Sequence, residues 1–410
     1  MADIDPGLTA RPAHVPPELV VDFDLFDIPG GEEDVQLAMR AFQQVSPDIF
    51  WTPRNGGHWV VTRAEDIAIV QRDWERFSNE CYMIPKKPAG GFREPPLDVD
   101  PPRHTELRRP LTVALMPKQV HEIETNIRQL AIDLIEAVLD RGSCEFVHEI
   151  GKVLPISIFL DLANLPREDQ KVLRPIAQQA INSPSQELRA DGFNQLGTYL
   201  LPIIRERREH PGDDLISQIV NVSDGGERIS EEDAFSYAAV VLFGGFDSVA
   251  SMLGFCIRYL ARHPDTRHEI VANLEDDAFM RSAAEELLRR HGMATTSRLV
   301  VQDSALKDAR FKAGDMVTIL HMLAGLDERF IADPLTLDLR RPPINTHGIF
   351  GSGAHACPGS VLARRELQIF LQEWLRRIPD YQIAPGSSSK TTMGTVACLS
   401  ELHLIWPTKA

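Results

Sequence analysis

Cys357 lies in a short loop whose residue types could hold a metal, the stretch FGSGAHACPG of residues 350–359. Glycine stands at three positions of this stretch: Gly351, Gly353 and Gly359. Glycine lets a backbone turn tightly and approach a flat group closely. A helix-forming run, residues 360–378, follows the loop, and the positive end of that helix favours the thiolate that binds metals. A cysteine is most often a packing residue, but this context predicts a thiolate ligand to a flat metal cofactor, for which haem iron is the obvious candidate.

An acid stands next to an alcohol in a second stretch, GGFDS of residues 244–248. An acid beside an alcohol, here Asp247 and Ser248, could pass a proton by way of water. The preceding Gly244 and Gly245 each cost about 1 kcal/mol relative to alanine inside a helix. We therefore expect them to interrupt a helix and to let a flat ligand lie against its backbone. The alternative is that Asp247 is a surface charge or a cap.

The elements that must position these residues are mainly helical. Apolar periodicity runs from about residue 229 to 263, and Ser230, three residues before an acid, is a helix-start signature. Helical patterns dominate residues 101–290, whereas residues 58–62 alternate like a strand and residues 395–406 are typical of further sheet. No repeat or linker is visible, so we expect one mainly α unit with a minor β region.

Composition and charge exclude several classes of protein. The chain of 410 residues is 43% hydrophobic and 25% charged, which is ordinary for a globular protein. Its net charge of −16 argues against nucleic acid as a partner. The longest apolar run, residues 237–246, is too short to span a bilayer and the N-terminus has no signal pattern, so we expect a cytoplasmic protein without a membrane anchor. Four further cysteines form no close pair and are expected to be small core residues: Cys81, Cys144, Cys256 and Cys398.

The loop around Cys357 resembles the haem-binding signature of the cytochrome P450 family, F-x-x-G-x-x-x-C-x-G. The resemblance implies a single P450 domain over residues 14–410, after a disordered tail of residues 1–13. Haem b would lie between the long helix and the helix after the cysteine loop, with Cys357 as axial ligand of the iron and Phe350 and the three loop glycines around it. Four residues would hold the haem propionates: His104, Arg108, Arg298 and His355.

Two further motifs of the family occur in the expected order. Glu286 and Arg289 match its E-x-x-R pair, a structural feature that would tie their helix to a later arginine, for which Arg341 is the candidate. The GGFDS stretch resembles the oxygen-activating segment A/G-G-x-D/E-T and implies Asp247 and Ser248 as the proton-delivering residues. Ser248 replaces the threonine common in the family and lacks the methyl group that restricts the rotamer. We expect proton delivery to be less ordered and some electrons to be lost to peroxide.

From about residue 14 to 406 the chain is similar to the soluble bacterial branch that hydroxylates camphor. Phe92 stands where that branch has a tyrosine that binds the camphor ketone, so camphor should bind weakly or in several poses. The likeness implies a mostly apolar pocket with one hydroxyl, lined by Met83, Phe92, Val240, Phe243, Gly244, Ala294, Thr395 and Val396. Such a pocket suits a terpenoid or norisoprenoid such as an ionone, or a camphor-like molecule.

The resemblance implies a monooxygenase that inserts one atom of O2 into a C–H bond. Two electrons would come from a [2Fe–2S] ferredoxin and an FAD-dependent ferredoxin reductase, because the chain has no flavin or iron–sulfur signature. Such ferredoxins are acidic, and Arg72, Arg109 and Arg364 are candidates for a basic docking patch, with solvated surface arginines as the alternative. A peroxide-driven hydroxylase and a non-catalytic haem-thiolate sensor or carrier are alternative functions, and the acid–alcohol pair argues against both.

Overall fold

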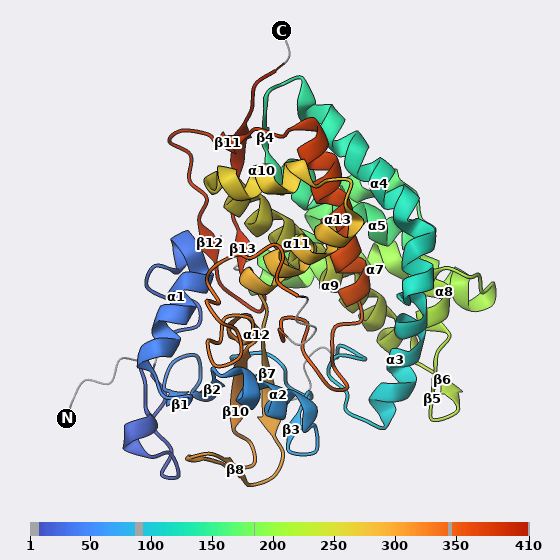
Figure 1. Ribbon diagram of the computed structural model, residues 1–410. Helices are drawn as coiled ribbons and strands as arrows, with labels where there is room; N and C mark the ends of the chain where they lie inside the picture. Colours follow the sequence, from blue (N-terminus) through green and yellow to red (C-terminus); the bar gives the residue numbers. More distant parts are fainter. Residues whose placement is uncertain (1–7, 87–92, 184, 343–346, 409–410) are drawn as a thin grey trace.

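Helix α9 (Glu231–Arg262), 32 residues long, packs against elements from both halves of the chain (Figure 1). Its start is capped by Ser230, whose hydroxyl accepts the Asp233 N–H at 2.9 Å. It ends just before Pro264, which begins α10 and has no N–H to donate. The predicted start and extent of the long helix are confirmed. The computed structural model describes residues 8–86, 93–183, 185–342 and 347–408.

Helices make up most of the described residues between 101 and 290, as predicted. The other helices are α1 (Gly31–Val45), α2 (Ala64–Arg72), α3 (Arg103–Ala114), α4 (Pro117–Leu139), α5 (Val153–Leu162), α6 (Gln170–Asn182), α7 (Gln186–Glu209), α8 (Leu215–Val220), α10 (Pro264–Ala272), α11 (Asp277–Arg290), α12 (His321–Ala324) and α13 (Ser360–Arg377). Short helical turns are η1 (Pro17–Leu19), η2 (Val147–Gly151) and η3 (Arg167–Asp169). Helix α13, which follows the cysteine loop, packs along α4 and also contacts α9 and α11.

The strands form one larger sheet and several small ones. The larger sheet has the order β1 (Ile49–Thr52), β2 (His58–Val61), β10 (Met316–Leu320), β7 (Thr295–Val300), β3 (Phe77–Ser78). Its pairs are antiparallel except β2 with β10. The smaller sheets contain β4 (Ser143–Glu145), β5 (Ser223–Asp224), β6 (Glu227–Arg228), β8 (Ser304–Leu306), β9 (Ala309–Phe311), β11 (Gln382–Ile383), β12 (Thr391–Thr392), β13 (Cys398–Leu399) and β14 (His403–Ile405). Of the expected N-terminal tail, residues 8–13 are described, and the Thr9 N–H donates to the Pro53 carbonyl at 2.9 Å.

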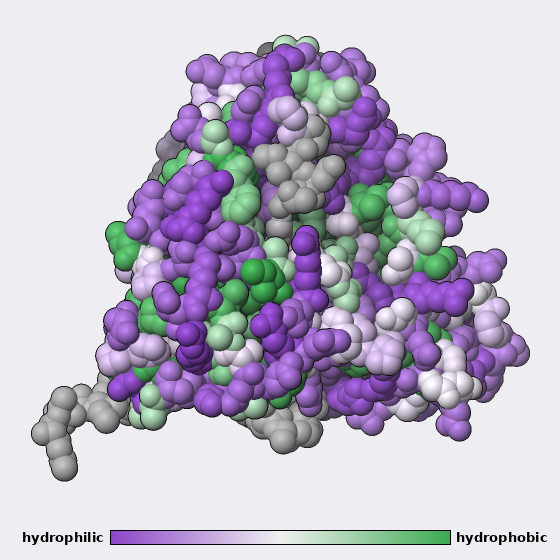
Figure 2. All heavy atoms as spheres, turned by 60° about the horizontal axis from the view of Figure 1, so that its bottom comes forward, coloured by the Kyte–Doolittle hydropathy of each residue, from purple (hydrophilic) through white to green (hydrophobic). Residues whose placement is uncertain are grey.

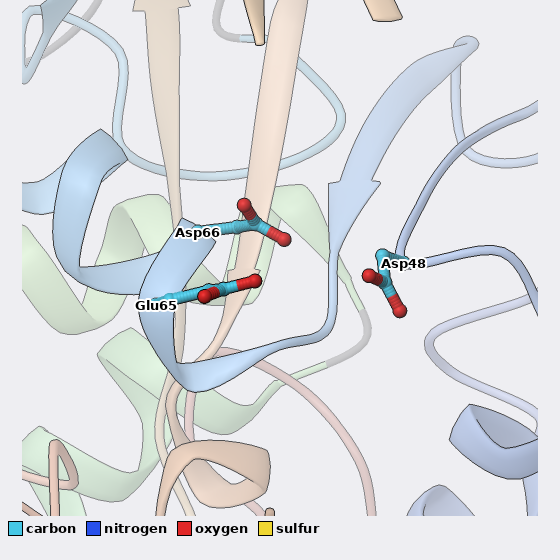
Figure 3. Close-up of side chains that lie close together, drawn as sticks. All are labelled: Asp48, Glu65 and Asp66. Atoms are coloured by element: carbon cyan, nitrogen blue, oxygen red, sulfur yellow. The ribbon is translucent and has the colours of Figure 1, made fainter. Parts of the chain in front are cut away.

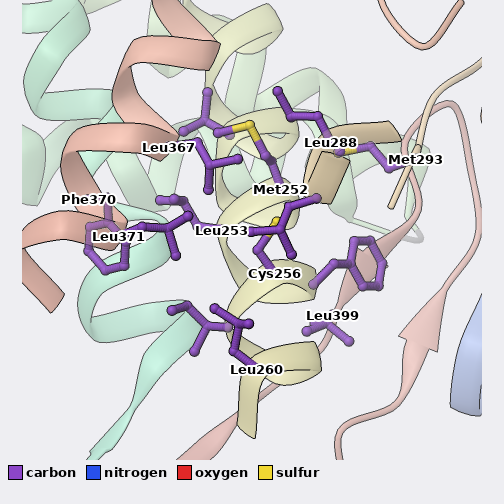
Figure 4. Packing of buried hydrophobic residues seen from close by; sticks show 14 of the residues in the cluster. Met252, Leu253, Cys256, Leu260, Leu288, Met293, Leu367, Phe370, Leu371 and Leu399 are labelled. Atoms are coloured by element: carbon purple, nitrogen blue, oxygen red, sulfur yellow. The ribbon is translucent and has the colours of Figure 1, made fainter. Parts of the chain in front are cut away.

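The hydrophobic interior consists of three clusters, and α9 contributes to two of them. In the largest, the C-terminal half of α9 packs against α11, α13 and β13 (Figure 4). Figure 4 shows Met252, Leu253 and Cys256 of α9 facing side chains of these neighbours. Among the described helices, α9 is the one long and apolar enough to cross a membrane, but 67% of its most apolar window is buried inside the protein. It is therefore a core helix.

The surface agrees with the high net charge. Hydrophilic residues cover most of the face in Figure 2, and apolar residues gather there in small separate patches. The mainly α architecture with a minor β region is as predicted.

Candidate active site

The loop around Cys357 is held by its own backbone hydrogen bonds. The Cys357 N–H donates to the Phe350 carbonyl at 2.7 Å, and the Ala356 N–H donates to the Gly353 carbonyl at 3.2 Å. Gly351 and Gly353 have φ angles of +71° and +76°, in the left-handed region that favours glycine. The loop thus folds back on itself just before α13, as predicted for these two glycines.

Two glycines of the loop have different roles. A Cβ on Gly353 would lie 3.0 Å from the Cα of Arg72 and from the Gln71 carbonyl, so the end of α2 passes close to the loop. Gly359 has an ordinary φ of −81°, and a Cβ there would stand 3.9 Å from the Cys357 sulfur. The expectation that Gly359 is needed for a tight turn is wrong, because any residue can adopt this backbone.

The Cys357 thiol is accessible and is also surrounded by protein atoms. The residue has accessible surface, although burial within the protein raises the pKa of its thiol. The Gly359 N–H and the charges of Arg108 and Arg364 act in the opposite direction and lower this pKa. A cation bound to the sulfur would complete the deprotonation that these groups favour.

Open space also lies beside the middle of α9. A Cβ on Gly244 or Gly245 would meet no neighbouring atom within 4 Å. The predicted interruption of the helix is wrong, since α9 continues through these glycines and the Ser248 hydroxyl donates to the Gly244 carbonyl of the preceding turn at 2.7 Å. Such a bond leaves a helix intact. Asp247, the neighbouring acid, is 8% exposed.

Basic side chains from α3, β7 and the cysteine loop gather in one group. The rings of His104 and His355 are 4.2 Å apart, and burial, with the nearby charges, lowers the pKa of His104 to about 4. Arg108 donates to the Ala356 carbonyl of the loop. Arg298 is 4% exposed, and burial lowers its pKa to about 10. The structure therefore brings together all four residues expected to hold propionates.

Asp100 is the carboxylate that the described residues place in this basic group. Its Oδ1 lies 3.6 Å from His355 Nε2 and accepts the Asn79 N–H at 3.0 Å. One carboxylate cannot neutralise the guanidinium groups of both Arg108 and Arg298, and buried charges are stable only when paired. A ligand with its own carboxylates, such as the two propionates of haem, fits this excess of positive charge.

Sequence reasoning missed a polar chain that joins the loop to the sheet. His321 Nε2 lies 2.7 Å from the Thr296 hydroxyl, and His321 Nδ1 lies 3.1 Å from Gln71 Nε2. The side-chain oxygen Oε1 of Gln71 accepts from the Ser352 hydroxyl at 2.8 Å. Arg298 also donates to the Thr296 hydroxyl at 3.3 Å. These partners come from four distant segments, so no local spacing signals the chain.

The expected role of the E-x-x-R pair is confirmed. Arg289 binds both oxygens of Glu286 at 2.7 Å, and Arg341 Nε donates to Glu286 at 3.1 Å. Arg289 also donates to the carbonyls of Gly325 and Pro334 at 2.7 Å. The pair therefore ties α11 to the chain segment that precedes the cysteine loop.

Arg364, expected in the docking patch, forms an ion pair within the protein while its side chain stays 34% exposed. Both oxygens of Glu285 accept from Arg364, at 2.7 and 2.8 Å, and His347 Nε2 lies 2.7 Å from the same carboxylate. Burial raises the pKa of Glu285, but these hydrogen bonds outweigh it and bring the pKa to about 2. Arg72 and Arg109 are exposed, and the described residues give neither an ion pair.

The expected pocket residues come from α9 and from two chain segments that meet beside it. Ala294 and Val396 form an isolated antiparallel bridge. The Thr295 N–H donates to the Thr395 carbonyl at 2.8 Å, and the Ala397 N–H donates to Met293 at 2.9 Å. These bonds hold the two segments together as one wall.

The remaining pocket residues are placed as follows. Val240, Phe243 and Gly244 share one face of α9. The Phe193 ring of α7 packs edge-on against Phe243 with ring centroids 5.7 Å apart. Phe193 was not among the pocket residues expected from the sequence. Met83 is half-buried, and Phe92 lies outside the described residues.

A group of three carboxylates elsewhere has the composition of a metal site. Glu65 and Asp66 of α2 lie near Asp48, just before β1 (Figure 3). The Lys307 ammonium stands among them, at 3.1 Å from Asp48 and 2.7 Å from both Glu65 and Asp66. Arg63 and Arg329 also bind Asp48. This group is an ion-pair network whose cations are Lys307, Arg63 and Arg329.

The chain matches the family model described as Cytochrome P450 over residues 145–402. Over 404 residues it is 31% identical to "Probable cytochrome P450 127A1" of Sinorhizobium fredii, covering 96% of each chain. The chain is a cytochrome P450. This P450 is also 29% identical to "Steroid C26-monooxygenase" of Mycolicibacterium smegmatis over 88% of each chain.

Two solved structures resemble this P450 over nearly its whole length. The crystal structure of CYP101J2 has a TM-score of 0.89 and 36% identity, covering 98% of this chain and 100% of that one. The crystal structure of cytochrome P450 CYP101C1 has a TM-score of 0.90 and 33% identity, covering 97% and 100%. The predicted family, fold and enzyme class are confirmed: this P450 is a monooxygenase that uses haem b.

Proposed function

We propose that this P450 hydroxylates a small, mostly apolar compound of terpenoid or norisoprenoid size, such as an ionone or a camphor-like molecule. The observation that carries the proposal is the wall in which Ala294 and Val396 are bridged beside Thr395. With Val240 and Phe243 of α9, this wall offers apolar contacts and a single hydroxyl. Few polar groups would have to be matched, so a substrate with one oxygen atom fits it better than a highly polar one.

The residues described above would hold the cofactor. When bound, haem supplies the activation of O2 and the oxidation of the C–H bond, with the Cys357 thiolate as its axial ligand. Phe350 and the loop glycines would lie against it, and four residues would bind its propionates: His104, Arg108, Arg298 and His355. The excess of buried positive charge around Asp100 supports this assignment.

Asp247 and Ser248 would move protons toward the oxygen. Reduction of O2 to water consumes protons, and a carboxylate next to a hydroxyl can carry them by way of water. The hydrogen bond from Ser248 to the Gly244 carbonyl keeps the hydroxyl beside the open space along α9. The missing methyl group still leaves this rotamer less restricted than that of threonine.

Electrons would come from a [2Fe–2S] ferredoxin reduced by an FAD-dependent reductase. Arg72 and Arg109 carry exposed positive charge. Val113, one helical turn after Arg109, is 40% exposed, and Met116 is 44% exposed. A cation beside apolar surface, as at Arg109, suits an acidic partner that docks transiently. With soluble partners of this kind, the enzyme would act in the cytoplasm.

Two alternative functions would not require the proton-delivering residues of α9. A peroxide-driven hydroxylase or a haem-thiolate sensor needs no proton delivery to O2. The presence of Asp247 and Ser248 favours the O2-dependent reaction over both.

The test is spectroscopic. Reduced protein under carbon monoxide should absorb near about 450 nm, Cys357→Ser should abolish this band, and the matched variant Cys256→Ser should keep it. Camphor, ionones and other terpenoids are then titrated into the ferric protein, and we expect at least one ionone to shift the iron to high spin. A band near about 420 nm in intact protein would remove Cys357 as the ligand. No spin shift with any apolar compound would overturn the proposed substrate class.

A further inference from the structure

Strand β13 packs against one face of α9. A Cβ on Gly254 would stand 3.2 Å from Cδ1 of Leu399, so the helix and strand approach closely here. The Ser251 hydroxyl donates to the Cys398 sulfur at 3.1 Å. Asp247, Ser251 and Gly254 recur at helical spacing and share this face of α9. The face toward β13 therefore begins at the acid expected to deliver protons.

Cys398 connects this face to the pocket wall. Its sulfur lies 3.6 Å from the Val396 carbonyl, to which the thiol donates. Burial raises the pKa of Cys398 to about 11, the nearby charge of Asp247 adds to this, and the bond from Ser251 opposes it. At neutral pH the group is therefore a thiol, which can accept from Ser251 and donate to Val396 together.

Residues 395–397, just before Cys398, make their other backbone contacts with the segment that contains Met293 and Ala294. Val396 is bridged to Ala294, and the Ala397 N–H donates to Met293 at 2.9 Å. Those contacts fix residues 395–397 relative to the sheet, whereas the chain of Ser251, Cys398 and Val396 fixes them relative to α9. The separation between helix and wall sets the width of the proposed pocket.

We propose that Cys398, held by Ser251, is a positioning residue that sets the distance of the Val396 wall from α9 and so determines which ligands the pocket accepts and in which pose. The inference rests on the proposed function for the location of the pocket. Neither Ser251 nor Cys398 is among the residues proposed to hold the cofactor or to move protons.

Cys256 provides a matched control. It lies on α9 and is fully buried in the core, and the described residues give its sulfur no hydrogen-bond partner. Removal of either sulfur leaves a small cavity and lowers stability. If a thiol only fills space in the core, its removal should lower stability and leave ligand affinity unchanged.

The experiment compares Cys398→Ala, Cys398→Ser, Ser251→Ala and Cys256→Ala as haem-loaded proteins. The probes are 4-phenylimidazole and 1-phenylimidazole, which coordinate the ferric iron and place a ring in the pocket, and binding is followed by the optical shift. Loss of one hydrogen bond of ordinary strength should change the affinity for at least one probe about three- to tenfold in Cys398→Ala and in Ser251→Ala. Cys398→Ser, which can keep both hydrogen bonds, should stay within about twofold. Cys256→Ala should lower the thermal midpoint and leave both affinities unchanged.

The inference would be overturned if Cys398→Ala and Ser251→Ala bound both phenylimidazoles as tightly as the unsubstituted protein does. Equal shifts in Cys256→Ala would do the same, because the effect would then be general loosening. The outcome is separable from that of the proposed function. If no ionone or camphor shifts the spin state while the phenylimidazole affinities change as expected, the substrate class is wrong and the positioning role stands.

Discussion

The cysteine loop and the wall of the proposed pocket are held in place by different kinds of interaction. Beside the loop, the half-buried Glu285 and the buried Glu286 bind arginines through paired hydrogen bonds. The wall at Val396 has a backbone bridge to Ala294 and the contact of Cys398 with Ser251. One region is fixed by charge, the other by a few neutral bonds and apolar packing.

This difference separates cofactor binding from ligand selection. Breaking a buried ion pair by removing one partner costs about 3–5 kcal/mol, whereas a neutral hydrogen bond contributes about 1 kcal/mol. Changes in the wall can therefore alter which compound binds while the cofactor site remains folded. Changes among the carboxylates beside the loop should affect the whole enzyme.

Glu286→Gln should have the largest effect on stability. The carboxylate is 4% exposed and accepts hydrogen bonds from Arg289, Arg341 and the Asp338 N–H. An amide leaves the buried Arg289 without a counter-charge, so we expect the free energy of unfolding to fall by about 3–5 kcal/mol. Urea unfolding measures this. Arg281→Gln, an exposed site on the same helix, should change it by less than about 0.5 kcal/mol, and equal effects at the two sites would contradict the comparison.

Asp247→Asn should have the next largest effect, on turnover and not on binding. An amide cannot deliver protons, so we expect product formation to slow about 100-fold. The spin-state affinity for the substrate should stay the same, because Asp247 is not one of the expected pocket residues. Rates of product and hydrogen peroxide formation, measured with ferredoxin and reductase, check this. An unchanged product rate would exclude Asp247 from proton delivery.

Local patterns predicted the parts of the fold that depend on neighbours in sequence. Ser230 caps α9 through the Asp233 N–H, and Gly351 and Gly353 adopt the left-handed backbone that the cysteine loop requires. Glu286 and Arg289 bind each other one turn apart. In each case both partners lie within a few residues, so the sequence shows them together.

Contacts between distant segments could not be predicted in this way. Ser251 and Cys398 are 147 residues apart, and His321 and Gln71 are 250 apart. The glycine pair of α9 was expected to break the helix because its propensity is poor, but packing along the whole helix outweighs a cost of about 2 kcal/mol for the two residues. The ion pair of Arg364 with Glu285 could not be predicted either, because the two residues are 79 apart in sequence.

Glu366 differs from Glu285 and Glu286 because its pKa is raised, and it should make the stability of the protein depend on pH. This residue of α13 is 2% exposed, and burial raises its pKa from 4.5 to about 8. Between these values the folded protein keeps a proton that the unfolded chain loses, so stability falls as pH rises. Glu366→Gln should be more stable than the unsubstituted protein by about 4 kcal/mol at pH 8 and equal to it near pH 4.

Urea unfolding across this pH range, with the exposed Glu122→Gln as control, tests the prediction for Glu366. A constant difference between Glu366→Gln and the unsubstituted protein at all pH values would mean that the carboxyl does not titrate in this window.

Thr395→Val should have the smallest effect, confined to ligands that carry an oxygen atom. Thr395 provides the hydroxyl of the proposed pocket, and the described residues give that hydroxyl no partner. Valine keeps the shape and removes the donor, so a ketone that binds there should lose about 0.5–1.5 kcal/mol of affinity. Camphor and its hydrocarbon counterpart bornane form a matched pair of probes. In spin-state titrations, Thr395→Val should weaken camphor about two- to tenfold and leave bornane unchanged, whereas equal losses for both would mean that the wall selects by shape alone.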